Sequence, residues 1–239
     1  MLNTQYDHTL TAEDRLFCDK QISREEVRNI VFKKMSKNKS FGLDGLPVEF
    51  YQRFWNDLED FFLILLDIIY KEGQLSNSQR KSVITLLYKK GEKTNISNYR
   101  PLSLTGTDYK ILAFILAERV QNVIYKLINT DQTGYIKGRF IGTNIRLVDD
   151  VIWYANKKNL PGAILFLDFK KAFDSLEWDF MFQALKKYDF GEKFLKWVRI
   201  LYNKPTACIK NSGWLSETFE LQRGVTKAVH SQHCFLFFV

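Results

Sequence analysis

The chain has 239 residues, and its 46% hydrophobic and 15% aromatic content is enough to bury a sizeable core, which excludes a disordered chain. We therefore expect one globular domain, or one and a half. Lysine and arginine number 35 against 27 aspartates and glutamates, a net charge of +8 that suits a polyanionic partner and is equally consistent with a basic surface that serves only solubility.

The sequence argues against export and against membrane insertion. The three cysteines, Cys18, Cys208 and Cys234, are few and far apart, which is typical of a reducing compartment. The N-terminus has neither a basic nor an apolar segment, so no secretory signal is predicted. The longest apolar run, 61–66, is cut by Asp67 and is too short to span a bilayer. We expect an intracellular protein, nuclear or cytoplasmic, that is neither secreted nor membrane-bound.

The first part of the chain is predicted to contain one helix between two irregular segments. Residues 1–20 are polar and show no period, so they are interpreted as a linker or an N-terminal edge. A Ser-x-x-Glu capping box at 23–26 precedes apolar residues at helical spacing, which predicts a helix over 23–36. A basic loop with two glycines follows at 37–47.

The middle of the chain is predicted to alternate between amphipathic helices and short strands. Aromatic and aliphatic residues recur every three or four positions over 48–71, which predicts one long helix or two short ones. The β-branched run 82–88 predicts a strand, and 98–104 is expected to be extended because it contains a proline. Helices are expected over 107–128 and 143–157, with a glycine-bearing basic loop between them.

The last part is predicted to return to strands. Residues 163–169 form a nearly continuous apolar run, which predicts a strand buried on both faces. Asp174, with Glu177 three positions later, is predicted to cap the next helix. Two further elements are expected, a helix over 194–201 and a hairpin of 206–209 with 218–221. The predicted fold class is α+β, with helices packed on a small sheet.

Asp168 is the first candidate for chemistry because it ends an apolar run whose other residues favour burial. A buried carboxylate is costly unless a cation or hydrogen-bond donors offset its charge. A divalent metal ion and a set of backbone amides satisfy it equally well, so both readings stay open. Asp149 and Asp150 lie in a helical pattern whose aliphatic residues are expected to face inward, and they are interpreted as solvated.

Basic residues beside glycines are the second set of candidates. Side-chain cations and exposed backbone amides together suit phosphate contacts, although each residue alone is interpreted as simply solvated. The set comprises Lys37, Lys39, Lys89, Lys90, Arg100, Lys137 and Arg139.

Several motifs occur in one order along the chain and carry a resemblance to a known family. They are Asn98-Tyr99-Arg100-Pro101-Leu102-Ser103-Leu104, then Lys110-Ile111-Leu112-Ala113 with Leu116-Ala117-Glu118-Arg119-Val120, then Asp131-Gln132-Thr133-Gly134-Tyr135, then the block from Phe166 to Asp174. Their order and spacing resemble the reverse transcriptases of non-long-terminal-repeat, LINE-type retrotransposons. The resemblance covers about residues 21–225.

The resemblance implies the fingers and part of the palm of a right-hand polymerase, which extends a primer 3′-hydroxyl with dNTPs on an RNA template. It implies that Asp168 is a ligand of two Mg²⁺ ions, with the Phe169 backbone carbonyl beside it. Phe173 matches a steric-gate position that excludes a ribonucleotide 2′-hydroxyl, and Lys89 and Arg100 match residues that bind the incoming triphosphate. The other loop cations are expected to contact the RNA template or DNA primer: Lys37, Lys39, Lys137 and Arg139.

The sequence departs from the family after 221–225. The family continues with a Gln-Gly-Cys-Pro-Leu-Ser type motif and then an Ala-Asp-Asp hairpin that completes the metal site, and neither occurs here. Residues 226–239 can be encoded so that a shifted frame gives Gln-Gly-Cys-Pro-Leu-Ser-Ala-Leu-Leu, and they are interpreted as that motif read out of frame. We therefore expect a partial, inactive reverse transcriptase domain over 21–225 with the thumb absent. The alternative is a non-catalytic, nucleic-acid-binding remnant of a retrotransposon.

Overall fold

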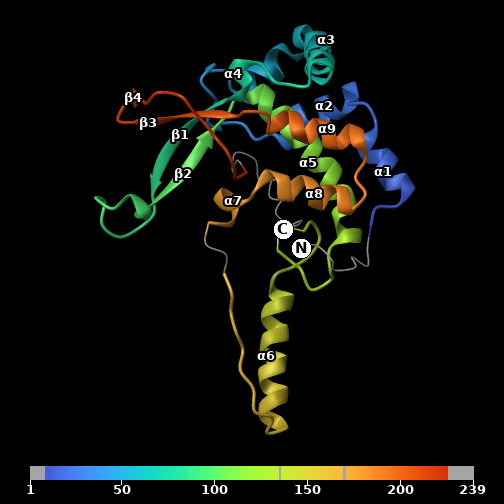
Figure 1. The fold of residues 1–239 in the computed structure, drawn as a ribbon, viewed down its shortest axis with the longest axis vertical. Helices are drawn as coiled ribbons and strands as arrows, with labels where there is room; N and C mark the ends of the chain where they lie inside the picture. The colour runs from blue at the N-terminus through green and yellow to red at the C-terminus, as the bar shows by residue number, and fades with distance from the viewer. Residues whose placement is uncertain (1–8, 135, 169–170, 226–239) are drawn as a thin grey trace.

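The computed structural model describes residues 9–134, 136–168 and 171–225. Within them, several helices pack around the long helix α5 (Thr107–Leu127), and a small mixed sheet lies at one end of this helical body (Figure 1). Helix α6 (Gly142–Lys157) leaves the body as a separate arm. This combination of helices and a mixed sheet agrees with the predicted α+β class.

The elements before α5 include both predicted strands. In chain order they are α1 (Ala12–Asp19), α2 (Arg24–Asn29), the π-helical turn η1 (Ile30–Lys34), α3 (Val48–Glu72), α4 (Asn77–Arg80), β1 (Lys81–Tyr88), the 3₁₀ turn η2 (Ile96–Asn98) and β2 (Tyr99–Leu104). The elements after α6 are α7 (Ala172–Ser175), α8 (Trp178–Lys187), α9 (Glu192–Leu201), β3 (Thr206–Asn211), β4 (Trp214–Leu215) and β5 (Phe219–Glu220). Across the described ranges, no helix is both long enough and apolar enough to cross a bilayer.

Most predicted elements are confirmed with small shifts at their ends. The predicted helices that the structure contains are those over 23–36, 48–71, 107–128, 143–157 and 194–201. The capping box at the start of α2 is present, because the Ser23 hydroxyl accepts from the Glu26 N–H and the Glu26 carboxylate accepts from the Ser23 N–H. The predicted strands over 82–88 and 98–104 and the C-terminal hairpin are also confirmed.

Helix α1 corrects the expectation that residues 1–20 are irregular. The Thr11 hydroxyl oxygen caps this helix by accepting from the Asp14 N–H at 3.2 Å. Lys126 of α5 donates to the Asp14 carboxylate at 2.7 Å, and Cys18 is fully buried in the core. Only two of the eight residues of α1 are buried, which is too few to leave a periodic apolar pattern in the sequence.

The sheet has the strand order β2-β1-β3-β4, and β5 also pairs with β3. Strand β1 is antiparallel to β2 and parallel to β3, so the chain must cross over between β1 and β3. That crossover contains the helices from α5 to α9. Strands β3 and β4 are joined by Ser212 and Gly213, both with positive φ (48° and 89°), as a two-residue hairpin turn favours.

Arg119 of α5 is the buried centre of the N-terminal half. Its guanidinium is 2% exposed and donates to both oxygens of the Glu26 carboxylate, at 2.9 and 3.0 Å. It also donates to the carbonyls of Cys18 at 2.8 Å, Lys20 at 2.7 Å and Gln21 at 3.3 Å. One side chain therefore joins α5 to α2 and to the segment between α1 and α2.

The contact with Arg119 affects the pKa of the Glu26 carboxyl. Burial favours a higher pKa, but hydrogen bonds from Arg119 and from the Ser23 N–H outweigh burial, so the pKa of Glu26 lies below its ordinary value. A carboxyl with a lowered pKa in the folded state contributes stability that is present above its unfolded pKa of about 4.3. That contribution is lost as the pH falls through the lowered folded value.

Arg119→Met is expected to lower the free energy of unfolding by about 3–5 kcal/mol near neutral pH, because Glu26 and the carbonyls lose their buried donors. Urea unfolding followed by circular dichroism measures this change. The matched control is Arg199→Met, which removes an exposed pair with Glu192 at 3.8 Å and is expected to cost less than about 1 kcal/mol. Equal losses in the two variants would contradict the buried role of Arg119.

Candidate active site

The β1–β2 hairpin brings together the two residues predicted to bind a triphosphate. Arg100 is opposite Leu87 in the register, and Lys89 follows Leu87 by two positions, so these side chains share one face of the hairpin. The Lys89 N–H donates to the Asn98 carbonyl at 2.8 Å, which continues the pairing beyond the end of β1. Both cations are exposed, and neither forms an ion pair with any residue that the structure describes.

The basic loop 37–47 is anchored to the start of α5. Lys37 and Lys39 are exposed on this loop, as a role in phosphate contact requires. The Lys110 ammonium donates to the Ser40 carbonyl at 2.8 Å, and burial holds the pKa of Lys110 below its ordinary value. The hydrogen bond from Lys110 therefore fixes the loop that carries the two exposed lysines.

Gly42 packs tightly against the backbone that leads into α5. A Cβ at Gly42 would lie 2.6 Å from the Gly106 nitrogen and 2.8 Å from the Thr105 carbonyl carbon. The Thr107 hydroxyl donates to the Leu46 carbonyl at 2.6 Å nearby. Only glycine allows this contact between the two backbones.

The two cations of the basic loop between α5 and α6 have different surroundings. Lys137 is exposed, whereas the Arg139 guanidinium reaches back to the C-terminal end of α5. There it donates to four backbone carbonyls, those of Tyr125, Ile128, Asn129 and Gln132. Carbonyls at the C-terminal end of a helix lack intrahelical partners, so Arg139 acts as a C-terminal cap of α5. Contact with nucleic acid stays a prediction for both residues, and the geometry favours Lys137.

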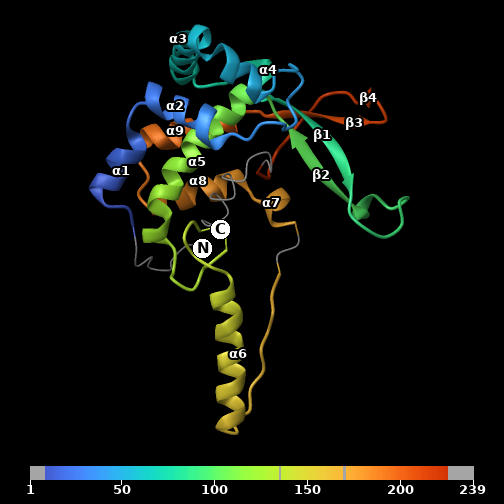
Figure 2. The ribbon, with the colours of Figure 1, turned by 180° about the vertical axis from the view of Figure 1, so that it is seen from behind.

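The predicted buried strand at 163–169 is wrong in its described part. Residues 163–168 have no regular secondary structure, and Leu165, Phe166 and Leu167 are 79%, 78% and 82% exposed. Asp168 is exposed at the end of this segment. A strand buried on both faces needs neighbouring strands, and no strand of the described residues pairs with this one. The segment instead runs back along α6 (Figure 1, Figure 2).

Helix α6 is also more exposed than its sequence indicates. The expectation that its aliphatic residues face inward is wrong, because none of its residues is buried, and Ile145 and Ile152 are 62% and 44% exposed. Asp149 and Asp150 are exposed, in agreement with their solvated interpretation. Apolar periodicity predicted the helix correctly, but it does not specify which element covers the apolar face.

The residues around Asp168 do not fit a pair of magnesium ions. Among the described residues, no group of three or more His, Cys, Asp or Glu side chains could hold a metal ion. Magnesium takes octahedral oxygen ligands, and one carboxylate does not fix two ions. Phe169, whose carbonyl is a predicted ligand, lies outside the described residues. No chemical step is therefore assigned to a metal in this chain.

Phe173 and Asp174 lie in α7. Phe173, the predicted steric gate, is partly buried against the hydrophobic core. The prediction that Asp174 caps the next helix is wrong, because Asp174 lies inside α7 and Glu177 is the N-cap residue of α8. The buried residue Leu176 between them is extended, which ends one helix before the next begins.

Residues 223–225 pack against α7, although they are distant from it in sequence. The Val225 N–H donates to the Phe173 carbonyl at 2.8 Å, and the Trp178 indole N–H donates to the Gly224 carbonyl at 2.8 Å. Gly224 has φ +88°, and a Cβ there would lie 3.1 Å from the Phe173 carbonyl oxygen. Residues 223–225, after which the sequence departs from the family, thus lie beside the block that contains Phe173.

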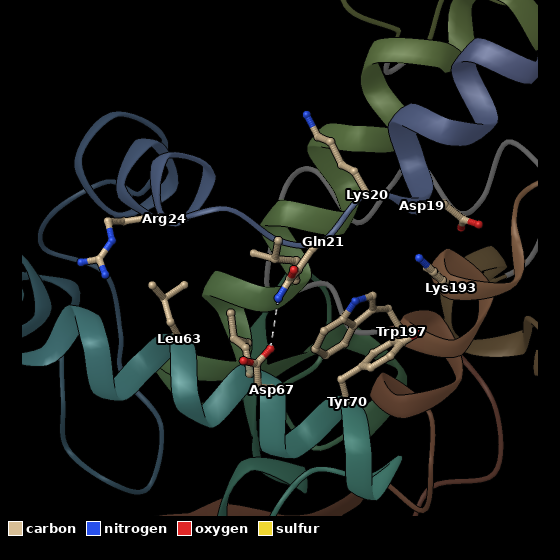
Figure 3. Close-up of a pocket in the computed structure, with 11 residues that line it drawn as sticks. Asp19, Lys20, Gln21, Arg24, Leu63, Asp67, Tyr70, Lys193 and Trp197 are labelled. Carbon is tan, nitrogen blue, oxygen red and sulfur yellow. Dashed lines mark hydrogen bonds between the residues drawn. The ribbon is translucent and has the colours of Figure 1, made fainter.

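A pocket of about 390 Å³ lies elsewhere, among the α1–α2 segment, α3 and α9 (Figure 3). Tyr70 and Trp197 form an aromatic wall with ring centroids 5.0 Å apart, and the Gln21 amide donates to the Asp67 carboxylate at 3.5 Å. Its lining carries charges of both signs and none of the predicted site residues. It therefore indicates no single class of ligand.

Gly42→Ala is expected to lower the free energy of unfolding by about 1–3 kcal/mol, because the added methyl group would overlap the backbone before α5. Thermal or urea unfolding measures the loss. Gly162→Ala is the matched control, since a Cβ there would meet no atom within 4 Å and needs no positive φ. A Gly42→Ala protein as stable as the control would show that the loop is not held by this contact.

Comparison with known proteins agrees with the family resemblance that these motifs carry. The family described as reverse transcriptase (RNA-dependent DNA polymerase) matches residues 88–229, which is more than half of the chain. An uncharacterized 149 kDa protein of transposon TX1 from Xenopus laevis is 38% identical over 191 residues, covering 80% of this chain and 15% of that protein.

Two retrotransposon proteins are more distant relatives. The Pol polyprotein of type-2 element R2DM from Drosophila melanogaster is 26% identical over 223 residues, covering 92% of this chain and 20% of its own length. The Pol polyprotein of a type-1 element R2 from Nasonia vitripennis is 25% identical over 207 residues, covering 85% and 19%. The chain thus spans 15–20% of the length of these three relatives. It belongs to the reverse transcriptase family, as its resemblance to the enzymes of non-long-terminal-repeat retrotransposons predicts.

Proposed function

We propose that residues 21–225 form the fingers and the first part of the palm of an RNA-directed DNA polymerase, with α1 packed on them. In this proposal the chain binds an RNA template and a DNA primer but does not add nucleotides by itself. The relatives are named as transposon or Pol proteins, which supports a retrotransposon origin. The primer, the template and the dNTP are carried over from the family.

The shared face of Lys89 and Arg100 is the observation that carries the binding half of the proposal. A guanidinium group can contact a phosphate through two parallel hydrogen bonds, and an ammonium group adds a compact positive charge. The two side chains lie on one short hairpin and are exposed. This geometry suits the phosphates of a nucleotide or of a nucleic-acid strand.

The other half of the proposal, that the chain does not add nucleotides, rests on the surroundings of Asp168. Two-metal phosphoryl transfer needs several oxygen ligands that hold both ions in a fixed geometry. Asp168 is exposed, and no Ala-Asp-Asp sequence occurs in the 239 residues. The magnesium ions that the family uses therefore lack a ligand set among the described residues. This favours nucleic-acid binding over polymerisation as the function of the chain.

The purified chain is expected to incorporate no dNTP when it is given an RNA template, an annealed DNA primer and Mg²⁺. A primer-extension gel measures incorporation. The Asp168→Asn variant is the control for a contaminating polymerase, since contaminant activity would be equal in both preparations. Incorporation that the wild-type chain supports and the variant loses would overturn the non-catalytic half of the proposal.

The double variant Lys89→Ala/Arg100→Ala is expected to bind single-stranded RNA more weakly. The slope of log affinity against log salt should fall in magnitude by about 1.4, because each lost phosphate contact removes about 0.7. Filter binding over a salt titration measures both quantities. The control removes two exposed lysines on other elements, Lys33→Ala/Lys71→Ala. Equal effects would assign the binding to general surface charge, and a wild-type chain without salt-dependent affinity would contradict the proposal.

A further inference from the structure

A projecting arm carries much of the exposed apolar surface of the molecule. We give this name to residues 142–168, which comprise α6 and the extended segment that runs back along it (Figure 1). Among the described residues, 29 large apolar residues are exposed, and eleven of them lie in the arm, six on α6 and five on the returning segment. Leu147, Val151 and Tyr154 recur at i, i+4 and i+7, so they share one side of the helix. No described element buries a residue of α6.

The turn at the tip of the arm is held by its own hydrogen bonds. The Leu160 N–H donates to the Ala155 carbonyl at 2.9 Å, and the Asn159 N–H donates to the Asn156 carbonyl at 3.2 Å. Asn159 has φ +50°, so these bonds form a Schellman motif, which ends α6 and reverses the chain. A surface that is already ordered loses less entropy when it associates.

The returning segment also offers an unpaired backbone. Residues 163–168 have no regular secondary structure, and none of their backbone groups forms a hydrogen bond to another described residue. Free backbone groups along an extended segment are a template for a further strand. Two copies of one segment can pair in the antiparallel direction about a twofold axis. The backbone of the segment is thus complementary to a second copy of itself.

The exposed area of the arm suffices for a stable interface. Its eleven large apolar residues are 44–82% exposed and present on the order of 1,000 Å² in total, given that an aromatic side chain buries about 150–250 Å². A specific interface of standard size buries about 800 Å² on each partner. The largest apolar patch of a typical monomer is about 300–600 Å². The larger area on the arm indicates an interaction surface.

The charge of the arm distinguishes a second copy from a polyanion. The arm carries three cations and three anions, which are Arg146, Lys157, Lys158, Asp149, Asp150 and Asp168. Its formal net charge is therefore zero, and the excess of +8 lies on the rest of the chain. A nucleic acid is attracted to the basic body, whereas two neutral arms have no net charge repulsion.

The length of the arm keeps two basic bodies apart. Helix α6 has 16 residues and rises about 1.5 Å per residue, so the arm is about 24 Å long. When two arms lie antiparallel, the two bodies lie at opposite ends of the pair. A separation of about 24 Å exceeds the Debye length of about 10 Å at 0.1 M salt, so the repulsion between the bodies is largely screened.

We propose that the projecting arm is a homodimer interface, in which the arms of two copies lie antiparallel about a twofold axis and their 163–168 segments pair as strands. An interface of this kind uses the same surface on both copies, so association closes at two. The proposal goes beyond the proposed function and does not depend on it, because the interface needs neither a nucleic acid nor a nucleotide.

Sedimentation equilibrium of the nuclease-treated chain at about 0.5 M salt tests the dimer, because this salt concentration weakens any bridging of two copies by nucleic acid. At about 20 μM protein we expect twice the 28.2 kDa of one chain and no larger species. A monomer at this concentration, or a distribution of species larger than a dimer, would overturn the proposal.

Leu165→Glu/Leu167→Glu is expected to weaken dimerisation roughly tenfold or more, because pairing would bury carboxylates of both copies in one interface. Both side chains are exposed in a single copy, so the fold should be kept, and circular dichroism checks this. The matched control is Leu16→Glu/Phe61→Glu, which changes two side chains that are each 71% exposed on α1 and α3 and should leave the dimer intact. Equal weakening in both variants would assign the association to general surface hydrophobicity and contradict the proposal.

Crosslinking identifies the surface that each copy uses. Phe166 is 78% exposed, and the photoreactive p-benzoylphenylalanine replaces it in a mixture of isotopically light and heavy chains. Crosslinks between residues 142–168 of a light and a heavy chain support the proposal. Crosslinks confined to single chains would show that another part of the same chain covers the arm, and crosslinks between chains at other surfaces would show a different interface. Either result overturns the proposal.

The outcomes separate this proposal from the proposed function. A chain that dimerises through its arm and binds no RNA contradicts the proposed function alone. A chain that binds RNA with the expected salt dependence and stays monomeric contradicts the arm interface alone.

Discussion

The buried guanidinium of Arg119 is the contact on which the N-terminal half of the molecule depends. A buried charge is tolerated only when its donors are satisfied, and here Glu26 and three backbone carbonyls supply the acceptors. The last residue of α1 is Asp19, whose carboxylate accepts from the Phe194 N–H of α9 at 2.7 Å. The end of α1 and the residues that follow it therefore link α5 to α9.

Strand β1 presents two chemically different surfaces. Its antiparallel pairing with β2 places Lys89 and Arg100 on one face and Tyr88 and Tyr99 on the other. Its shorter parallel pairing with β3 ends at Thr85. The alternation of side chains along β1 and β2 thus places the two cations and the two aromatic rings on opposite faces of the hairpin.

Sequence patterns predicted correctly the helices that follow from local geometry. They failed for the run 163–168, whose burial depends on contacts with other parts of the chain. The capping box at 23–26 and the apolar period of α5 identified their helices because both patterns follow from local geometry. The apolar run 163–168 has a strand composition but no pairing partner among the described residues, so its prediction failed. Arg139 shows a second limit, since a sequence reveals its charge but not the four carbonyls that it contacts.

Asp168 is therefore better understood through its neighbours than through its motif. A carboxylate becomes a metal ligand when a fold holds other oxygen ligands beside it, and an isolated exposed carboxylate prefers water. The side chains of Leu165, Phe166 and Leu167 are exposed, whereas a paired strand would bury them. The neighbouring helix α6 also has no buried residue. Exposed apolar segments with unpaired backbone promote association. Among the residues that the structure describes, the absence of a strand partner for 163–168 therefore accounts both for the exposed position of Asp168 and for the exposed apolar side chains beside α6.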